Sequence, residues 1–195
     1  PAGGGGFVND LKGMLMLKGP SFVSAAKNPA SLIPGLVILA VVQVAYQFGQ
    51  WRSAQEAMEL FDAFGLDFDL GLDFFIKSGV YSFISAIVFA VVLFMMATKA
   101  FKGKAEADMK GFIGMYGMLL LPMALSVVPI LGLVGGIWVL IMLFVMAMNV
   151  FGFSFWKSLG VVLLSALIVG IVLMPLAGAL GVGDVAGEFS FDYSY

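Results

Sequence analysis

Two residue types that often carry chemistry are absent from this sequence, which contains neither cysteine nor histidine. Zinc, iron–sulfur and blue-copper sites take ligands from these two residue types, and haem almost always does. Nucleophilic catalysis loses its usual base, because no histidine can activate a serine. A pair formed by Lys157 with Ser154 or Ser158 is the remaining alternative, and we do not favour it. We therefore expect no cofactor and no enzymatic activity.

Charged residues are also scarce. They make up 11% of the chain, compared with about 25% in an average globular protein. Hydrophobic residues make up 62%, and the mean hydropathy is +1.07. Such a composition is typical of an integral membrane protein. The apolar runs are too long and continuous for the alternating strands of a membrane barrel, so we predict an all-α, five-span transmembrane helical bundle.

The spans are counted from the positions of the charges that interrupt the apolar runs. The segment 110–157 is too long for one crossing and suits two crossings with a turn near 126–132. The predicted spans are 31–50, 75–96, two within 110–157, and 159–181. The transmembrane domain then covers 31–182, with an acidic outer loop at 51–74 and a basic inner loop at 99–110. Residues 1–30 precede it, and an acidic, aromatic tail at 183–195 follows it.

Lysines predict the orientation of the bundle, because Lys and Arg near span ends remain on the cytoplasmic side. In the five-span arrangement eight lysines share one side: Lys12, Lys18, Lys27, Lys99, Lys102, Lys104, Lys110 and Lys157. The opposite side receives most acids, and its only cations are Arg52 and Lys77. We therefore predict a cytoplasmic amino terminus and an outer carboxyl terminus. Lys157 is interpreted as part of a cytoplasmic turn beside an aromatic belt.

The amino-terminal segment 1–30 is predicted to be cytoplasmic or interfacial. Phe7, Leu11, Met14 and Leu15 recur at helical spacing with lysines beside them, which is typical of a short helix lying in the membrane interface. The segment has no basic stretch followed by an apolar core and a cleavage site. We therefore expect the first span to act as the targeting signal.

Away from their ends, where Lys77 lies, the predicted spans contain no charged side chain, which weighs against ion coupling but not against movement of a lipid or a neutral solute. The few polar side chains are Gln43, Gln47, Ser82, Ser85, Thr98 and Ser126. We expect them to form hydrogen bonds between helices rather than to bind a substrate. Small residues such as Gly132, Gly135 and Gly136, or Gly170 with Gly178, suggest close helix packing.

Two segments of the predicted outer side alternate at period two. In the first, Asp67, Asp69 and Asp73 have a spacing similar to that of calcium loops, but the alternating apolar residues resemble a strand more closely, so calcium is a weak candidate. In the second, the tail, Phe189, Phe191, Tyr193 and Tyr195 form one aromatic face. This face is predicted either to dock on a neighbouring subunit or to rest in the interfacial belt.

The arrangement resembles the Yip-domain family of Ypt/Rab-interacting membrane proteins, in its prokaryotic type. The residues that carry the resemblance are Tyr116 and Pro122 in the third span, Trp138 in the fourth, and Gly152, Ser154 and Lys157 in the aromatic turn after it. The resemblance covers nearly the whole chain. The Asp-Leu-Tyr-Gly-Pro element of the eukaryotic members is present only as Gly19-Pro20 followed by Phe22. Binding of small GTPases is therefore not part of what the resemblance implies.

Two functions are compatible with these observations. The favoured one is a noncatalytic accessory or scaffold subunit of a larger membrane complex, as the resemblance to noncatalytic prokaryotic Yip-domain proteins implies. The alternative is a small permease or a lipid-handling protein with its path between the spans. The expected partners are the lipid bilayer and other membrane-protein subunits, with no nucleic acid. The expected location is the prokaryotic cytoplasmic (inner) membrane.

Overall fold

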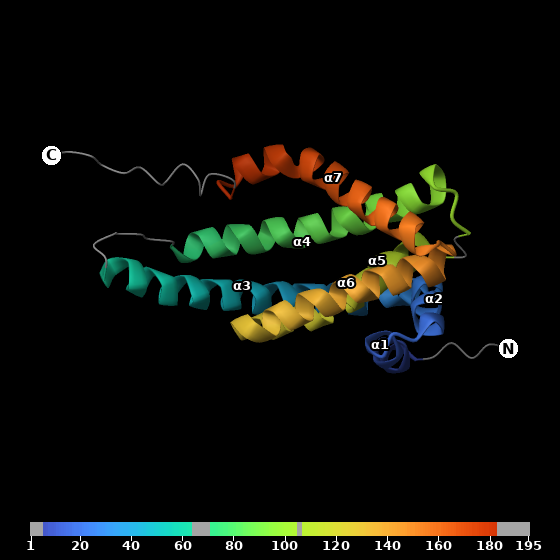
Figure 1. The fold of residues 1–195 in the computed structure, drawn as a ribbon, viewed down its shortest axis with the longest axis horizontal. Helices are drawn as coiled ribbons and strands as arrows, with labels where there is room; N and C mark the ends of the chain where they lie inside the picture. The colour runs from blue at the N-terminus through green and yellow to red at the C-terminus, as the bar shows by residue number, and fades with distance from the viewer. Residues whose placement is uncertain (1–5, 64–70, 105–106, 183–195) are drawn as a thin grey trace.

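A computed structural model describes residues 6–63, 71–104 and 107–182, and contains only helices and connections in these ranges (Figure 1). Five of the helical segments are long and apolar enough to cross a membrane. The prediction of an all-α five-span bundle is thus confirmed. The helices are α1 (Phe7–Leu15), α2 (Gly19–Lys27), η1 (Pro29–Ser31), α3 (Leu32–Ala63), α4 (Leu72–Met95), η2 (Met96–Ala100), α5 (Met109–Leu119), η3 (Leu121–Val127), α6 (Pro129–Phe151) and α7 (Phe155–Ala179).

Helix α3 is longer than the first predicted span. It continues to Ala63, so residues 51–63 of the predicted outer loop are helical. Neither glycine nor proline occurs between Gln50 and Ala63, and the side chain of Arg52 pairs with that of Glu56 one turn later at 3.2 Å. Because the rise is 1.5 Å per residue, the part of α3 that follows Arg52 extends the helix by roughly 17 Å. The acids of this segment are therefore carried on a helix.

The third span consists of two short helices. The α-helix α5 ends at Leu119, and Pro122 lies in the 3-10 helix η3 that follows. Proline has no N–H for the α-helical ladder and its ring clashes with the preceding turn, which accounts for the change of helix type. The chain becomes extended at Val128 and then enters α6 at Pro129. The break falls within the turn predicted at 126–132.

Glycines allow α3 and α5 to make backbone contact. A Cβ added to Gly114 would lie 2.2 Å from the carbonyl oxygen of Ser31, and one added to Gly117 would lie 2.2 Å from that of Gly35. A Cβ on Gly35 would in turn meet the carbonyl oxygen of Gly114 at 2.0 Å. These distances are shorter than any side chain tolerates. The third span therefore lies directly against the first.

This contact places α5 in the middle of the bundle. Residues 114–119 are all buried, and they include Met115, Met118 and Leu119, which have no exposed surface. On α6, Gly135 continues the close packing, because its added Cβ would lie 2.3 Å from the carbonyl oxygen of Pro122. Helices α3, α5, η3 and α6 thus form one tightly packed group. Helices α4 and α7 pack on each other and complete the bundle (Figure 1).

The connections that carry the lysines meet at one end of the bundle (Figure 1). We call it the lysine end, and it comprises residues 7–28, 99–104, 107–110 and 151–157. The amide of Lys104 donates to the carbonyl of Phe151 at 3.1 Å, and the amide of Asp108 donates to that of Ala26 at 3.1 Å. The eight lysines grouped by sequence therefore lie at the same end. Helix α3 ends and α4 begins at the opposite end, as Figure 1 shows.

At the lysine end the chain forms two short helices where the sequence predicted one. Helix α2 buries Phe22, Ala25 and Ala26 completely, at the spacing of one helix face. Asp10 of α1 is 5% exposed, and its carboxylate accepts a hydrogen bond from the Ser24 hydroxyl at 3.2 Å. Burial raises the pKa of Asp10, and the Ser24 hydroxyl partly offsets this shift. The helices α1 and α2 thus form a compact pair.

The glycine contact leads to a first prediction. Replacing Gly114 with Ala should destabilise the protein by about 1–3 kcal/mol, because the new Cβ meets backbone that has to shift. The matched control is Gly136→Ala on α6, where an added Cβ meets no atom within 4 Å. This control should leave stability unchanged or raise it, because alanine favours helix more than glycine does. Thermal midpoints measured in detergent compare the two variants, and equal midpoints would contradict the backbone contact.

Candidate functional site

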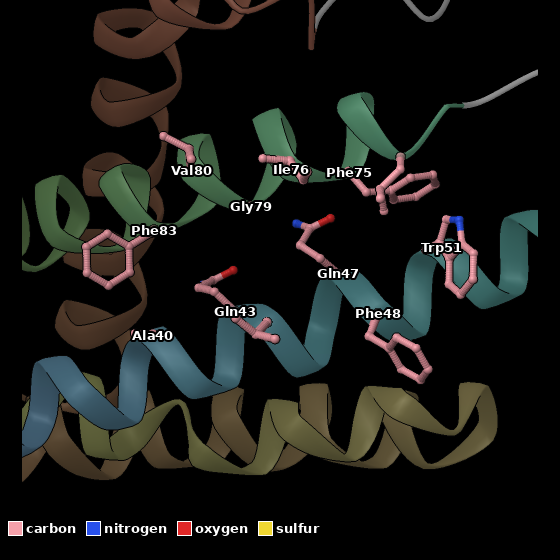
Figure 2. A pocket seen from close by; sticks show the side chains of 12 residues that line it. Ala40, Gln43, Gln47, Phe48, Trp51, Phe75, Ile76, Gly79, Val80 and Phe83 are labelled. Carbon is pink, nitrogen blue, oxygen red and sulfur yellow. The ribbon is translucent and has the colours of Figure 1, made fainter.

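The seam between α3 and α4 carries two glutamines. Gln43 and Gln47 are one helical turn apart on α3, and in Figure 2 both side chains point towards α4. The Nε2 atom of Gln47 donates to the Ser82 hydroxyl on α4 at 3.5 Å. This bond joins two spans, as the sequence predicts for polar side chains in this bundle. Its length is near the upper limit for a hydrogen bond, so it is weak.

On one side of this seam lies an apolar groove of about 540 Å³, which we call the seam groove (Figure 2). Only α3 and α4 line it, and its wall residues Val44, Ile76 and Val80 are exposed, so the groove is open to the surface of the bundle. Its walls are formed by Ala40, Gln43, Val44, Gln47, Phe48 and Trp51 of α3 and by Leu72, Phe75, Ile76, Gly79, Val80 and Phe83 of α4. Apart from the two glutamines, these side chains are apolar or aromatic. The groove occupies the half of the bundle that is farther from the lysine end.

A second cavity of about 500 Å³ lies among all five spans, and we call it the central cleft. Helices α5, α6 and α7 contribute apolar or aromatic side chains such as Leu120, Val139 and Val169 to its walls. Its polar lining is formed by Gln43, Tyr46, Tyr81, Ser82, Ser85 and Tyr116. Gln43 lines both cavities. The central cleft and the seam groove therefore meet at Gln43, and the bond from Gln47 of the groove to Ser82 of the cleft joins their linings a second time.

Four buried polar atoms have no hydrogen-bond partner within the described protein, and two of them belong to residues that line the central cleft. They are Oε1 of Gln43 and the hydroxyls of Ser78, Ser85 and Ser165. Gln43 and Ser85 line the central cleft, Ser165 precedes the lining residue Ala166, and Ser78 precedes Gly79 of the groove. A buried polar atom without a partner costs about 1–3 kcal/mol. A ligand or water that supplied the missing hydrogen bonds would remove this cost.

The electrostatic character of the site is neutral. None of the described residues that line either cavity is charged. The nearest ion pairs lie at the end of the seam groove, where Arg52 pairs with Glu56 on α3 and Lys77 pairs with Asp73 on α4 at 2.6 Å. Both pairs are exposed and stay within one helix, so each stabilises little. The site is therefore suited to an uncharged molecule.

Most residues that carry the family resemblance lie away from these cavities. Tyr116 is the exception, because it lines the central cleft with its ring 5.6 Å from that of Phe89. Pro122 is buried in η3, and Trp138 lies on α6 with 37% of its surface exposed. The structure does not bring Trp138 to the cleft. Its neighbour Val139 lines the cleft instead.

The aromatic turn after α6 lies at the lysine end. Gly152 has a φ of +67°, a left-handed conformation that ends α6 and that glycine adopts without strain. Ser154 stands at the start of α7, and its carbonyl accepts the Ser158 hydroxyl at 3.0 Å. The Lys157 ammonium lies 4.5 Å from the centre of the Phe153 ring. The exposed position of Lys157 agrees with its interpretation as part of a polar turn.

Two groups of predicted site residues fall outside the described ranges. The tail residues Phe189, Phe191, Tyr193 and Tyr195 lie beyond residue 182, and Asp67 and Asp69 lie in the segment 64–70. Their proposed roles in docking and in calcium binding stay predictions. Asp73 is described, and its carboxylate pairs with Lys77 in the first turn of α4. Within the ranges that the structure covers, no three acids come together in a geometry that would hold a metal ion.

Sequence reasoning missed part of the polar lining. Tyr46 and Tyr81 line the central cleft, and Ser78 and Ser165 have unpaired hydroxyls, yet none of the four was singled out as a functional candidate. The helical spacing contained a usable signal, because Ser78, Ser82 and Ser85 recur at intervals of four and three residues on one face of α4. A polar stripe inside an apolar span indicates a face turned towards protein or towards a cavity.

Comparisons with known proteins add no relative, because no family model, curated protein or solved structure matches this chain. The fold and the geometry of the two cavities therefore carry the functional interpretation.

Proposed function

We propose that this chain is a noncatalytic integral membrane protein that holds an uncharged lipid or solute in the central cleft between its spans. The observation that carries the proposal is a neutral cleft at membrane depth, two of whose lining residues, Gln43 and Ser85, each have a buried side-chain oxygen without a hydrogen-bond partner. In hydrocarbon no water is present to satisfy these atoms, so either a bound molecule or trapped water has to do so. A cleft of about 500 Å³ lies within the usual range for small-molecule sites, about 300–1,000 Å³.

The central cleft favours the second of the two functions considered from sequence, a permease or lipid-handling protein, over an accessory subunit. Sequence alone favours an accessory subunit, because the spans lack charged side chains away from their ends and because the family resemblance implies a noncatalytic protein. In the structure only Gln47 and Ser82 form a hydrogen bond between spans among the glutamines and serines of the seam, whereas the Gln43 Oε1 atom and the Ser85 hydroxyl, on residues that line the cleft, are buried without a partner. Handling of a lipid or a neutral solute therefore becomes the leading proposal.

An accessory role remains a second candidate, and a separate feature supports it. Gly160 and Gly178 of α7 are 18 residues apart, which is five helical turns, so they share one face. An added Cβ at either position meets no atom within 4 Å. Small residues on an uncovered helix face let another transmembrane helix approach closely. A neighbouring subunit would fit this face, and the predicted tail contact would add to it.

The family resemblance also stays a proposal. It is supported by the left-handed turn at Gly152 and by the burial of Tyr116 and Pro122. Location in the prokaryotic cytoplasmic membrane rests on the same resemblance. Membership would be consistent with a noncatalytic role and would leave the identity of the ligand open.

A filled cleft provides the test of the leading proposal. Gly170 lines the central cleft, and a Cβ added there meets no atom, so Gly170→Leu should occupy the cavity without disturbing the fold. Gly160→Leu is the matched control on the same helix, outside the lining. The probe is a chloroform extract of the membrane in which the protein is produced, separated on an anion-exchange resin into uncharged and acidic lipids.

The uncharged fraction should raise the thermal midpoint of the detergent-washed wild type and of Gly160→Leu, because a ligand that binds only the folded state stabilises it. The midpoint of Gly170→Leu should not change on addition of this fraction. An effect confined to the acidic fraction, or an equal response of both variants, would contradict the proposal.

The orientation of the bundle is proposed from the lysines. Because the eight lysines lie at one end, we propose that this end faces the cytoplasm. Alkaline phosphatase, which is active only outside the cytoplasm, should be active when fused after Tyr195 and inactive when fused after Lys104. Green fluorescent protein fused at the same two positions should give the reverse pattern. Phosphatase activity at Lys104 would contradict the proposed orientation.

A further inference from the structure

We infer that the bound molecule is an uncharged long-chain lipid with a hydroxyl-bearing head group, held with its head in the central cleft and its chain in the seam groove. This inference rests on the proposed function and names the class of ligand and its route. The route would run sideways from the bilayer, between α3 and α4. The two cavities are the observation behind it, because each suits a different part of one amphiphilic molecule.

The seam groove has the dimensions and the chemistry of a chain site. It extends along α3 from Ala40 to Trp51, which is 12 residues with a rise of roughly 17 Å. Half of a hydrocarbon core of about 30 Å is close to this length, so one acyl chain of one leaflet would fill it. Its apolar walls do not attract water. The groove is open at the surface of the transmembrane bundle, where lipid chains surround the protein. A hydrocarbon chain is therefore the natural occupant.

The central cleft has the chemistry of a head-group site. The Gln43 Oε1 atom can only accept a hydrogen bond, so the ligand has to donate one, whereas the Ser85 hydroxyl can donate or accept. A free hydroxyl meets both requirements. A phosphate or carboxylate would need a cationic partner, and none of the described lining residues is charged. These requirements together select an uncharged head group that carries a hydroxyl.

The boundary between the two cavities can open. Gln43 lines both cavities, and the bond that joins Gln47 of the seam groove to Ser82 of the central cleft is long at 3.5 Å. Gly79 faces Gln47 across the seam, and an added Cβ there would lie 3.2 Å from the Cγ atom of that glutamine. The absence of a side chain at Gly79 thus gives Gln47 its room. A hydroxyl that enters from the seam groove can replace Ser82 as the partner of Gln47.

Trp51 lines the seam groove and provides a direct probe of its occupant. The chain has three tryptophans, so the double variant Trp138→Phe, Trp156→Phe leaves Trp51 as the only one. The protein is placed in nanodiscs of unbrominated phosphatidylcholine that contain a small, increasing fraction of a monoacylglycerol with a brominated chain. Bromine quenches indole fluorescence on contact. Phosphatidylcholine with the same brominated chain is the control lipid.

The monoacylglycerol should quench Trp51 along a saturating curve, and at the same low fraction the brominated phosphatidylcholine should quench it several-fold less. A second background, Trp51→Phe with Trp156→Phe, leaves the exposed Trp138 of α6, which should show weak quenching proportional to the fraction of either lipid.

Gly79→Leu should abolish the saturating component, whereas Gly136→Leu should retain it. Gln43→Leu should weaken the apparent affinity about tenfold, the usual size for a lost hydrogen bond to a buried group.

Equal quenching of Trp51 by both lipids would overturn the inference, because the seam groove would then be ordinary lipid-exposed surface. The proposed function would survive that result if the uncharged extract still stabilised the wild type and not Gly170→Leu. The ligand would then occupy the central cleft alone. Loss of both effects would reject the proposed function together with the inference.

Discussion

The backbone contact between α3 and α5 is the constraint on which the rest of the bundle depends. Gly35, Gly114 and Gly117 remove the side chains that would hold the two helices apart, and the third span consequently lies against the first in the middle of the molecule. Lipid supplies no hydrophobic driving force between spans, so packing of this closeness is a main source of association. The remaining spans, α4 and α7, then pack around a centre that is already occupied.

This arrangement explains why the polar residues of the seam remain unsatisfied. Helix α3 makes its closest contacts with α5 through glycines, while the face with Gln43 and Gln47 meets the serine-bearing face of α4. One weak bond joins the two faces, and Gln43 and Ser85, which line the central cleft, each keep a buried oxygen without a partner. Each unpaired atom has a cost, so a neutral ligand that pairs with them would also stabilise the fold. Packing, the central cleft and the proposed binding of a lipid are in this way parts of one account.

The sequence predicted the elements far better than their pairing. Long apolar runs and interrupting charges predicted the five spans, and the length of the segment 110–157 predicted the turn between the third and the fourth, which the structure places before Pro129. The extension of α3 past Arg52 was missed because a polar segment beside a span is interpreted as a loop. Contacts between spans depend on three-dimensional neighbours, so the central position of α5 was not predictable. The same limit applies to the glycines that the sequence suggested as packing sites. Gly132 and Gly135 do pack closely, but Gly136, Gly170 and Gly178 face open space.

The central claim is that the folded bundle carries one uncharged, lipid-like molecule, and native mass spectrometry measures this directly. The protein should be extracted from its own membrane in a mild detergent, without added lipid, and transferred intact to the gas phase. The account predicts a population heavier than the bare chain by one ligand mass, which is lost when the protein is unfolded and which extracts as an uncharged compound. A spectrum with only the bare chain, under conditions that preserve the fold, would contradict the account.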